Sequence, residues 1–498
     1  MIVLTTTAHT VDAVLAQVES QRAWIDGVEL RVDLLDEREW GRVGELPSLL
    51  RTAGGEGMLV CTFRRDADGG RAVCDEARRL AVLRAAVVGG FDYIDLESDL
   101  PADEPHQALV AEAHEAGATV IRSFHDFTGV PANLTVLMTS LARSPGEIPK
   151  CAVTPRSTGD VVRLLETAQE LGDAPRILIG MGEYGFLTRV LVRRFGNLLT
   201  FASVPGESAA PGHASPEVLA ELYRVADHTD STRLFAVMGN PIGHSKSPAY
   251  HNRRFAEESV DACYVPVLVD DVEAFFRLAD RLPLLGFSVT IPHKRTVMSY
   301  LSEVGDDVRA ADACNTVLRV PAGWRGVNTD VIGFLAPLHE VVEAPLAGVR
   351  VLVLGAGGAA RAVVYALATR EANVLVWNRT AARAEALVRE LSVITGARSL
   401  CVLEPGADAT PRDVPAVDIV VNTTSLGMHR EGDPAPWYRF AGHEIAYDIV
   451  YTPPETPLIE RAASAGCRVV TGDRMFAAQA AAQYELYRVL ATADSADA

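Results

Sequence analysis

The chain has 498 residues, which is too many for one hydrophobic core, so we expect two or more large domains. Its composition, 48% hydrophobic and 22% charged, is typical of a globular α/β protein and excludes fibrous or largely disordered chains. The net charge of −19 argues against broad nucleic-acid binding, which requires clustered lysine and arginine.

The beginning of the chain, MIVLTTTAHT, lacks the basic and long apolar stretches of a secretory leader. No window offers the roughly 18 uncharged apolar residues that a membrane span needs. The seven cysteines form no CxxC pair, and we interpret them as reduced and mostly buried thiols. These features predict a cytoplasmic protein with no membrane or nucleic-acid partner.

Short β-branched runs alternate with Ala/Leu/Arg-rich stretches of helical period over the first 205 residues. Eight strand-and-helix units in roughly 200–230 residues fit an α/β fold of the (β/α)₈ barrel type. We therefore predict a TIM barrel over residues 1–229, bounded by a polar linker near residue 230. The predicted strands are Ile2–Thr6, Val28–Leu35, Met58–Arg64, Tyr93–Ser98, Thr119–Phe127, Lys150–Thr154, Arg176–Gly182 and Leu199–Ser203.

Polar side chains accompany the ends of these predicted strands. In a (β/α)₈ barrel the carboxyl ends of the strands surround the active site, so these side chains are the candidate functional residues. They are Glu29, Arg31, Asp33, Arg64, Asp95, Glu97, His125, Asp126, Lys150 and Arg189.

Two of these residues, Lys150 and His125, are candidates for covalent catalysis. Alone, a lysine at a strand start is most often solvated, and a histidine is most often a core or capping residue. Lys150, however, lies between Pro149 and an apolar run, and such surroundings are expected to lower the pKa of its ammonium toward that of a nucleophilic amine. His125 is the candidate base, and Glu97 can orient its imidazole. No HxH, HExxH or Cys/His cluster accompanies them, so we predict no metal site.

The ordered runs ELRVDLL, TFRRDADGG, DYIDLESD, SFHDF, PKCAVTP and MGEYGFLTR resemble the type I 3-dehydroquinate dehydratases over nearly all of residues 1–215. The resemblance implies that Lys150 forms an imine with the substrate ketone, and that His125, held by Glu97, removes the α-proton. The implied ligands of the substrate's hydroxyls and carboxylate are Glu29, Arg31, Arg64 and Arg189.

One segment departs from that family's pattern. The loop over the barrel mouth normally reads Ser-Ala-Pro-Gly-Gln, whereas residues 209–213 here read Ala-Ala-Pro-Gly-His. Ala209 and His213 therefore replace two residues that contact the substrate in the family.

A second α/β part is expected to begin with a substrate-binding domain over residues 230–335. GNPIGHSKSPAYHN (239–252) places Ser245 and Ser247 in a Gly/Pro-framed loop before a predicted helix. Hydroxyls and free backbone N–H groups at a helix start suit a carboxylate, although the same pattern is a common helix cap. Further polar candidates in the motifs SVTIPHK, ACNT and GVNTD are Thr290, Lys294, Asn315 and Asp330.

The remaining residues, 336–498, contain from Val349 the motif VRVLVLGAGGAARAV, in which Gly355, Gly357 and Ala360 follow an apolar strand and open an Ala-rich helix. Strand, turn and helix together predict a Rossmann dinucleotide-binding domain. The next predicted strand ends in Asn378-Arg379-Thr380, where NAD-binding proteins usually have an acidic residue for the ribose hydroxyls. Because Arg379 suits a 2′-phosphate instead, we predict NADP as the cofactor.

These motifs, with VNTTSLGM, YDIVYTPPETPL and MFAAQAAAQYE, resemble shikimate dehydrogenase over residues 234–490. The resemblance implies that Lys294 and Asp330 are the polar catalytic pair and that the C-terminal helix returns to the substrate domain. The implied substrate ligands are Ser245 and Ser247 for the carboxylate, with Thr290, Asn315, Asp330, Tyr451 and Gln479. The implied NADP contacts are Gly355, Ala356, Gly357, Gly358, Ala359, Asn378, Arg379, Thr380, Thr423 and Met428.

Together the resemblances imply dehydration of 3-dehydroquinate to 3-dehydroshikimate, followed by NADPH-dependent reduction to shikimate. One alternative is a quinate/shikimate dehydrogenase that uses NAD, against which the serine pair and Arg379 argue. Another is a metabolite-sensing regulator derived from these folds. Such a regulator is expected to have lost its catalytic lysines and to carry a DNA-binding module, yet Lys150 and Lys294 are present and no basic motif is appended.

Overall fold

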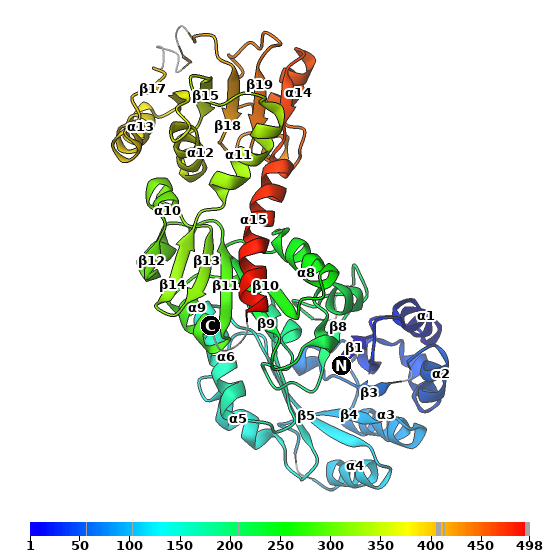
Figure 1. Cartoon of the computed structure of the whole chain (residues 1–498). Coiled ribbons are helices and arrows are strands. Elements are labelled where there is room, and N and C mark those ends of the chain that lie inside the picture. The colour runs from blue at the N-terminus through cyan, green and yellow to red at the C-terminus, as the bar shows by residue number, and fades with distance from the viewer. Residues whose placement is uncertain (56, 102, 208–209, 405–409, 412–413, 494–498) are drawn as a thin grey trace. The chain divides into compact units, whose positions relative to one another are not determined.

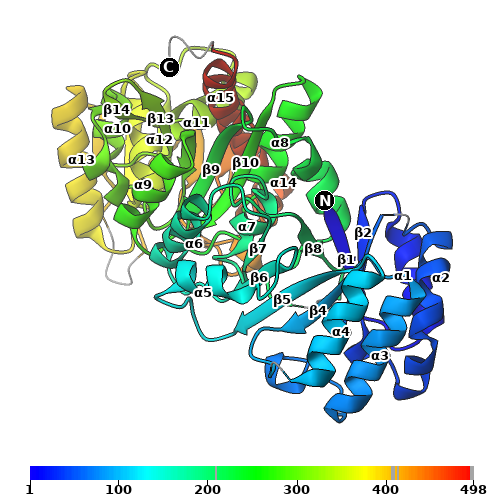
Figure 2. The same cartoon turned by 90° about the horizontal axis from the view of Figure 1, so that it is seen from below.

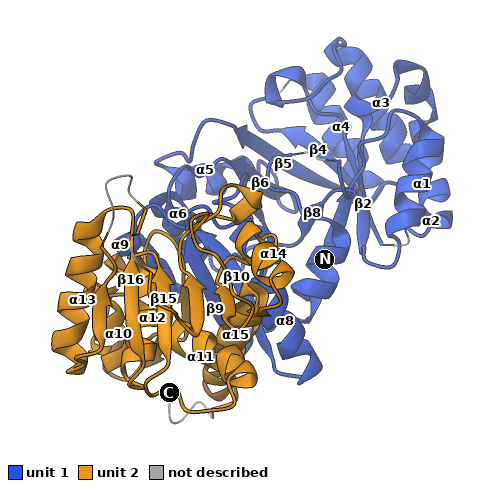
Figure 3. Cartoon of the chain, turned by 90° about the horizontal axis from the view of Figure 1, so that it is seen from above, with its two compact units in different colours: residues 1–284 blue, residues 285–498 orange. Residues whose placement is uncertain are grey.

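The structure is a computed structural model that describes residues 1–493 except 56, 102, 208–209, 405–409 and 412–413. The chain divides into two compact units, Met1–Leu284 and Leu285–Ala498 (Figure 3). A bilayer-spanning segment would need a long helix with few charged residues, and the described residues contain no such helix.

Unit 1 begins with eight parallel strands in the order β7-β6-β5-β4-β3-β2-β1-β8. Near the gap between β7 and β8, Arg176 pairs with Asn197 in a parallel bridge, and the Asn197 side chain bonds to both backbone groups of Leu178. The eight predicted strands are therefore confirmed, and they form the predicted barrel-like sheet. The strands are β1 (Ile2–Thr5), β2 (Gly27–Arg31), β3 (Met58–Thr62), β4 (Tyr93–Glu97), β5 (Thr119–Asp126), β6 (Ile148–Val153), β7 (Ile177–Gly180) and β8 (Thr200–Ala202).

Helices cover the outside of these strands, as the two views of α1 to α4 show (Figures 1 and 2). Because side chains alternate across a strand, apolar residues such as Val60, Ile121 and Phe201 fill the lower barrel interior. The residues between them pack outward against the helices. The helices are α1 (Val11–Gln21), α2 (Leu46–Thr52), α3 (Glu76–Gly89), α4 (Glu104–Glu115), α5 (Leu134–Leu141), α6 (Thr158–Glu170) and α7 (Phe186–Val190).

Unit 1 continues beyond the barrel into β9 (Arg233–Gly239), α8 (Ser247–Glu257), β10 (Ala262–Leu268) and α9 (Val272–Arg281). β9 and β10 are parallel. The barrel is joined to this segment at the start of α6, where the backbone N–H and the hydroxyl of Thr158 both donate to Asp270 Oδ1, at 2.8 and 2.7 Å. Arg281 also pairs with Glu166 on α6 at 2.7 Å. The segment after the linker is therefore part of the same compact unit as the barrel.

Unit 2 starts with strands in the order β11-β13-β14-β12. β13 is antiparallel to both β11 and β14, and β12 is parallel to β14. The elements are β11 (Leu284–Val289), β12 (Glu303–Val304), α10 (Asp306–Ala311), β13 (Thr316–Val320), β14 (Gly323–Val327) and α11 (Asp330–Val341).

The rest of unit 2 is a six-stranded parallel sheet in the order β17-β16-β15-β18-β19-β20. Val351 and Val353 on β15 pack on one face with residues of α12, and Leu352 and Leu354 pack on the other face. Both faces are thus covered, as in a Rossmann fold. The elements are β15 (Arg350–Leu354), α12 (Gly358–Ala368), β16 (Asn373–Trp377), α13 (Ala381–Thr395), β17 (Leu400–Val402), β18 (Ile419–Asn422), β19 (Ile445–Asp448), α14 (Pro457–Ser464) and β20 (Arg468–Val470).

The last helix, α15 (Gly472–Thr492), connects the two sheets of unit 2 (Figure 1). It packs along α11, and its far end reaches β13. There Gln483 accepts a hydrogen bond from Ser288 Oγ at 3.1 Å and donates one to Thr316 Oγ1 at 2.9 Å. Gly333 on α11 permits the close approach, because a Cβ added there would lie 2.5 Å from Gln479 Cβ.

Candidate active sites

The first candidate site is a pocket at the carboxyl ends of the barrel strands, centred on Lys150. The residue is buried, and its ammonium lies 3.0 Å from Asp95 Oδ2 and 3.6 Å from Glu29 Oε1. The Phe201 ring centroid is 4.5 Å from Nζ. The two carboxylates and the ring hold the amine at a fixed position in the barrel.

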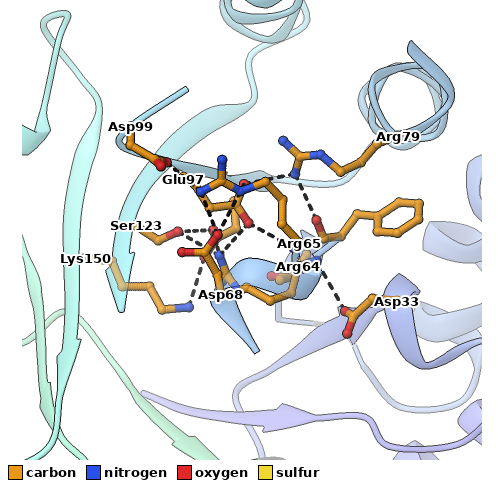
Figure 4. A network of polar contacts seen from close by, with 12 residues as sticks. Asp33, Arg64, Arg65, Asp68, Arg79, Glu97, Asp99, Ser123 and Lys150 are labelled. Atoms are coloured by element: carbon orange, nitrogen blue, oxygen red, sulfur yellow. Dashed lines mark hydrogen bonds and ion pairs between the residues drawn. The ribbon is translucent and has the colours of Figure 1, made fainter. Parts of the chain in front are cut away.

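A network of carboxylates and arginines lies beside Lys150 (Figure 4). Arg64 Nη1 donates to Asp95 at 2.9 Å, to Glu97 at 3.0 Å and to Ser123 Oγ at 2.8 Å. Burial alone would raise the pKa of Asp95, but the cations of Arg64 and Lys150 outweigh burial and hold that pKa well below its usual value. Asp95 is therefore a permanent anion opposite the lysine.

Glu97 does not hold His125, contrary to the expectation. Glu97 accepts hydrogen bonds from Arg64, from Arg79 at 3.0 Å and from the backbone N–H of Arg65. These donors use both carboxylate oxygens, and in the described part of the chain no hydrogen bond joins Glu97 to His125. Glu97 instead holds Arg64, Arg65 and Arg79 in place beside the pocket.

His125 lines the same pocket as Lys150 and is partly buried. Its Nδ1 is buried without a hydrogen-bond partner. Burial lowers the pKa of His125 well below its usual value, and the nearby cations of Arg64 and Lys150 lower it further. The imidazole is therefore neutral at physiological pH and has the protonation state that a general base requires.

The other predicted ligands, Glu29, Arg31 and Arg189, also line this pocket. Thr5 and Thr62 each donate to Glu29 at 2.8 Å. Arg31 forms a two-pronged pair with Asp33, with both N···O distances 2.8 Å. Neighbouring side chains therefore fix the positions of Glu29 and Arg31 in the pocket.

Arg189 differs because no carboxylate balances its charge within the described residues. The side chain is 1% exposed, its two terminal nitrogens donate only to the carbonyls of Phe201 and Pro211, and Nε has no partner. Burial lowers the pKa of Arg189 to about 10. A buried cation without a counter-ion is unfavourable in the free protein, so this position is suited to an anionic ligand.

The loop over the barrel mouth contributes His213 to the pocket wall. His213 Nδ1 is bonded to Ser203 Oγ, and the Gly182 N–H donates to Pro211 O at 3.0 Å. Gly212 has φ +79°, and a Cβ there would lie 2.7 Å from Gly182 O, so glycine is required at this close approach. Ala209, the other altered position, lies outside the described residues.

Unit 2 contains a second group of predicted residues. Lys294 Nζ lies 2.6 Å from Asp330 Oδ2, and Asn315 Nδ2 donates to Asp330 Oδ1 at 2.8 Å. Thr329 links this group to α15 through a long 3.5 Å contact with Gln479 Oε1. The structure thus brings four of the predicted residues into one hydrogen-bonded group.

Two other predicted substrate ligands of unit 2, Thr290 and Tyr451, have different neighbours. Thr290 follows β11, and its carbonyl accepts from the His293 N–H. Tyr451 is 37% exposed, with its ring 5.6 Å from that of Phe476.

In unit 1, the predicted serine pair stands at the start of α8. Ser245 Oγ accepts a 3.3 Å hydrogen bond from the Ser247 N–H. Ser247 is the first residue of the helix, and Pro248 follows it. The local geometry is that of a helix start with two serine hydroxyls, in which the Ser247 N–H is already bonded to Ser245.

The glycine-rich turn follows β15, as predicted. Gly355 has φ +117°, and a Cβ there would lie 2.5 Å from Thr423 Oγ1, so this position requires glycine. Thr423 Oγ1 itself donates to Leu354 O at 2.7 Å. Gly357 caps α12, and a Cβ added there or at Gly358 would meet nothing within 4 Å. Together with Ala356 and Ala359, these residues form an open helix N-terminus that suits a pyrophosphate.

At the end of β16, Asn378 Nδ2 bonds to Thr380 O at 2.9 Å and shapes the turn. Arg379 is exposed, and within the described part of the chain its guanidinium has no hydrogen bond or ion pair. The end of this strand thus offers a free cation.

A buried pair, Asn422 and Asp448, connects the two loops that carry Thr423, Met428 and Tyr451. The two residues are opposite one another on β18 and β19 and share a 2.9 Å hydrogen bond. Asp448 also accepts from the Val450 N–H at 2.9 Å and from Thr456 Oγ1 at 2.6 Å. Burial raises the pKa of Asp448 to about 6.

Comparison with known proteins agrees with both halves of this arrangement. Family models match residues 2–230 as type I 3-dehydroquinase, residues 237–317 as the shikimate dehydrogenase substrate binding domain, and residues 338–425 as shikimate/quinate 5-dehydrogenase. The chloroplastic bifunctional 3-dehydroquinate dehydratase/shikimate dehydrogenase of Arabidopsis thaliana is 30% identical over 93% of this chain and 77% of its own length. The chain belongs to this bifunctional family.

Other similar proteins match only about half of this chain and are named as shikimate dehydrogenases. The NADP(+) shikimate dehydrogenase of Shouchella clausii is 38% identical over 51% of this chain and 92% of its own length. A shikimate dehydrogenase solved in complex with NADP⁺ has a TM-score of 0.47 at 29% identity, covering 53% of this chain and 94% of that chain.

In the dehydratase part, Asp95 was one of the candidate functional residues predicted from the sequence, but it had no assigned role. The alternation of side chains along β4 was the available signal, because Asp95 and Glu97 are two residues apart and so face the same side. The contact of Phe201 with the Lys150 ammonium had no comparable local pattern, because it depends on closure of the sheet. His213 was expected at the pocket only through the resemblance of the mouth loop to the family's pattern.

Proposed function

We propose that the chain catalyses two consecutive reactions, dehydration of 3-dehydroquinate in the barrel and reduction of 3-dehydroshikimate in the dehydrogenase part. The observation that carries the first assignment is one pocket that contains a fixed lysine, a neutral histidine and a buried arginine without a counter-ion. An amine, a base and an anion site are what a lysine-dependent dehydration of a carboxylate requires.

In the dehydratase step, neutral His125 takes a proton from the Lys150 ammonium, and the resulting amine attacks the substrate ketone. His125 returns that proton to the carbonyl oxygen, which leaves as water when the protonated imine forms. The protonated imine makes the neighbouring C–H more acidic, and neutral His125 accepts that proton. The same imidazolium then protonates the β-hydroxyl, which leaves as a second water, and hydrolysis of the imine consumes one water and releases the product. One water is released overall.

The other pocket residues have binding and positioning roles. Arg189 binds the substrate carboxylate, which supplies the counter-ion that the protein does not provide. Glu29, Arg31 and Arg64 contact hydroxyls or hold their neighbours in place. Glu97 is a positioning residue, because its contacts reach Arg64, Arg65 and Arg79.

In the dehydrogenase step, Lys294 is the general acid. Its ammonium, held by Asp330 at 2.6 Å, stabilises the alkoxide that develops on the ketone oxygen and donates a proton to it. Asn315 orients Asp330, and Thr290, Tyr451 and Gln479 are ligands of the ring hydroxyls. Ser245 and Ser247 are ligands of the carboxylate.

NADP fits the dinucleotide site because open space lies at Gly357 and Gly358, and among the described residues no acid is bound to Arg379. The pyrophosphate would be held by Gly355, Ala356, Gly357, Gly358 and Ala359. Asn378, Arg379 and Thr380 would hold the 2′-phosphate, with Thr423 and Met428 near the nicotinamide. When bound, NADPH supplies the hydride.

We further propose domain boundaries near residues 230 and 336, supported by the residues that the three family models match. A reducing compartment such as the cytoplasm suits the seven unpaired cysteines, of which five are buried.

A coupled assay tests the proposed function. With 3-dehydroquinate and NADPH, the enone absorbance should rise and NADPH absorbance should then fall. Lys150→Ala should abolish enone formation while NADP-dependent shikimate oxidation continues, and Lys294→Ala should do the reverse, mainly through kcat. Both variants must melt like the parent. Loss of both activities in either folded variant would contradict two independent sites.

A further inference from the structure

A hollow of about 450 Å³ lies on the outer wall of the barrel, lined by residues of α4, β5 and the turn after α5. Its polar lining includes Arg122, Arg143, His106 and His114. The described lining contains two arginines and two histidines but no aspartate or glutamate. This composition is unusual in a chain whose net charge is −19.

Arg122 supplies the most informative group in this hollow. The residue is 3% exposed, and its Nε and Nη2 donate to Glu147 Oε1 at 3.0 and 2.9 Å. Its Nη1 is buried and has no hydrogen-bond partner. A buried guanidinium N–H without an acceptor is unfavourable, so a ligand with an acceptor oxygen would complete this side chain's hydrogen bonding.

The neighbouring acids are already bound to other groups. Glu147 accepts from Arg122 and, through Oε2, from the backbone N–H groups of Arg143 and Ser144. His106 bonds to Asp103 and Glu76, one at each ring nitrogen. Arg143 donates only to backbone carbonyls and has no acidic partner among the described residues. Arg143 is therefore the cation of this hollow whose charge no described acid balances, while the charge of Arg122 is shared with Glu147.

The hollow is separate from the dehydratase pocket although both use β5. Arg122 and His125 are three residues apart, so their side chains leave the strand on opposite faces. His125 lines the barrel interior, whereas Arg122 lies among the helices. Pro101, Val110 and Ala111 form the apolar part of the lining, and Gln107 and Ser144 complete it.

We infer that this hollow binds a small organic oxyanion, a carboxylate or phosphate ester on a ring-sized apolar body. The oxyanion accepts from Arg122 Nη1 and faces the charge of Arg143, and the apolar body lies against Pro101 and Val110, with Ala111 at the exposed edge of the hollow. This site is additional to the two proposed active sites.

The test uses a matched pair of substitutions at Ala111, an exposed helical residue whose replacement leaves the barrel core intact. Ala111→Glu places a carboxylate in the hollow, and Ala111→Gln adds the same bulk without charge. Arg122 is left unchanged, because its removal would deprive buried Glu147 of its partner. Calorimetric titrations of the full chain use benzoate and phenyl phosphate, with benzyl alcohol as the neutral control.

We expect at least one anion to bind the parent and Ala111→Gln alike, and to bind Ala111→Glu about tenfold more weakly or not at all. The anion that binds identifies the class of ligand. Equal binding to the two Ala111 variants would place any bound probe elsewhere and overturn the inference. The absence of anion binding to the parent, or equally strong binding of benzyl alcohol, would overturn it as well.

Discussion

Lys150 Nζ and Asp95 Oδ2 lie 3.0 Å apart in the barrel interior, and Arg64 bonds to the other oxygen of the same carboxylate. Asp95 thus balances two cations at once. It keeps the lysine directed into the pocket without acting as a proton acceptor, because its pKa is held low by both neighbours. Proton transfer in the proposed dehydration is left to His125.

Lys150 should be trapped covalently by the product. Borohydride added with 3-dehydroshikimate reduces an imine to a stable amine, and Lys150 is the only lysine before residue 230. Peptide mapping should therefore find the adduct on Lys150 and leave Lys246 and Lys294 unmodified. An active dehydratase that gives no adduct on Lys150 would rule out the covalent mechanism.

Arg189→Met should stabilise the ligand-free protein and weaken the dehydratase. The substitution removes a buried cation without a counter-ion, so the free energy of unfolding should rise, on the order of 1–3 kcal/mol. The KM for 3-dehydroquinate should rise by at least about tenfold, since a charged hydrogen bond to the carboxylate is lost. Thermal melts with and without product, together with steady-state kinetics, check both effects. An unchanged KM would place the carboxylate elsewhere.

Arg379→Ala should weaken NADP(H) by about 1.5–3 kcal/mol and leave NAD(H) almost unaffected, because only NADP(H) carries the 2′-phosphate. Cofactor titrations of the parent and the variant measure the difference. Arg389→Ala, which removes an exposed arginine on α13, is the matched control for net charge. Equal losses for both cofactors would refute the assignment.

Asp448 should make the stability of unit 2 depend on pH. Its folded pKa of about 6 is above the ordinary 3.8, so the folded protein holds this proton more tightly than the unfolded chain. That stabilisation is complete below about pH 4 and is lost as the pH rises through about 6. Asp448→Asn removes the ionisation while keeping the size of the side chain.

Relative to the parent, Asp448→Asn should therefore gain stability between about pH 4 and about pH 8, on the order of 3 kcal/mol in total. Scanning calorimetry of both proteins across this range measures the gain. A difference that does not change with pH would mean that Asp448 keeps the same protonation state in the folded and unfolded chain.

Much of the fold was predictable because it depends on local patterns. The eight barrel strands follow from short apolar runs, and the turn at Gly355 follows from its glycine spacing. The partners of charged residues were harder to predict. Glu97 was expected beside His125, but it is bonded to three arginines, two from the loop after β3 and one from α3, whose approach depends on packing between elements. Ser245 and Ser247 gave a signal for a helix start, which the sequence alone could not distinguish from a ligand site.

The bond between Thr158 and Asp270 bears on how the two enzymes could be separated. Asp270 accepts from the first N–H of α6, the helix that directly follows the strand carrying Lys150. A protein truncated at the linker would lack Asp270 and Arg281. The first N–H of α6 would then have no acceptor from Asp270, and Glu166 would lose its ion-pair partner. A stand-alone dehydratase made from this chain should therefore either extend to residue 284 or receive a new acceptor for the Thr158 N–H, which Ser157, the cap of α6, does not bind.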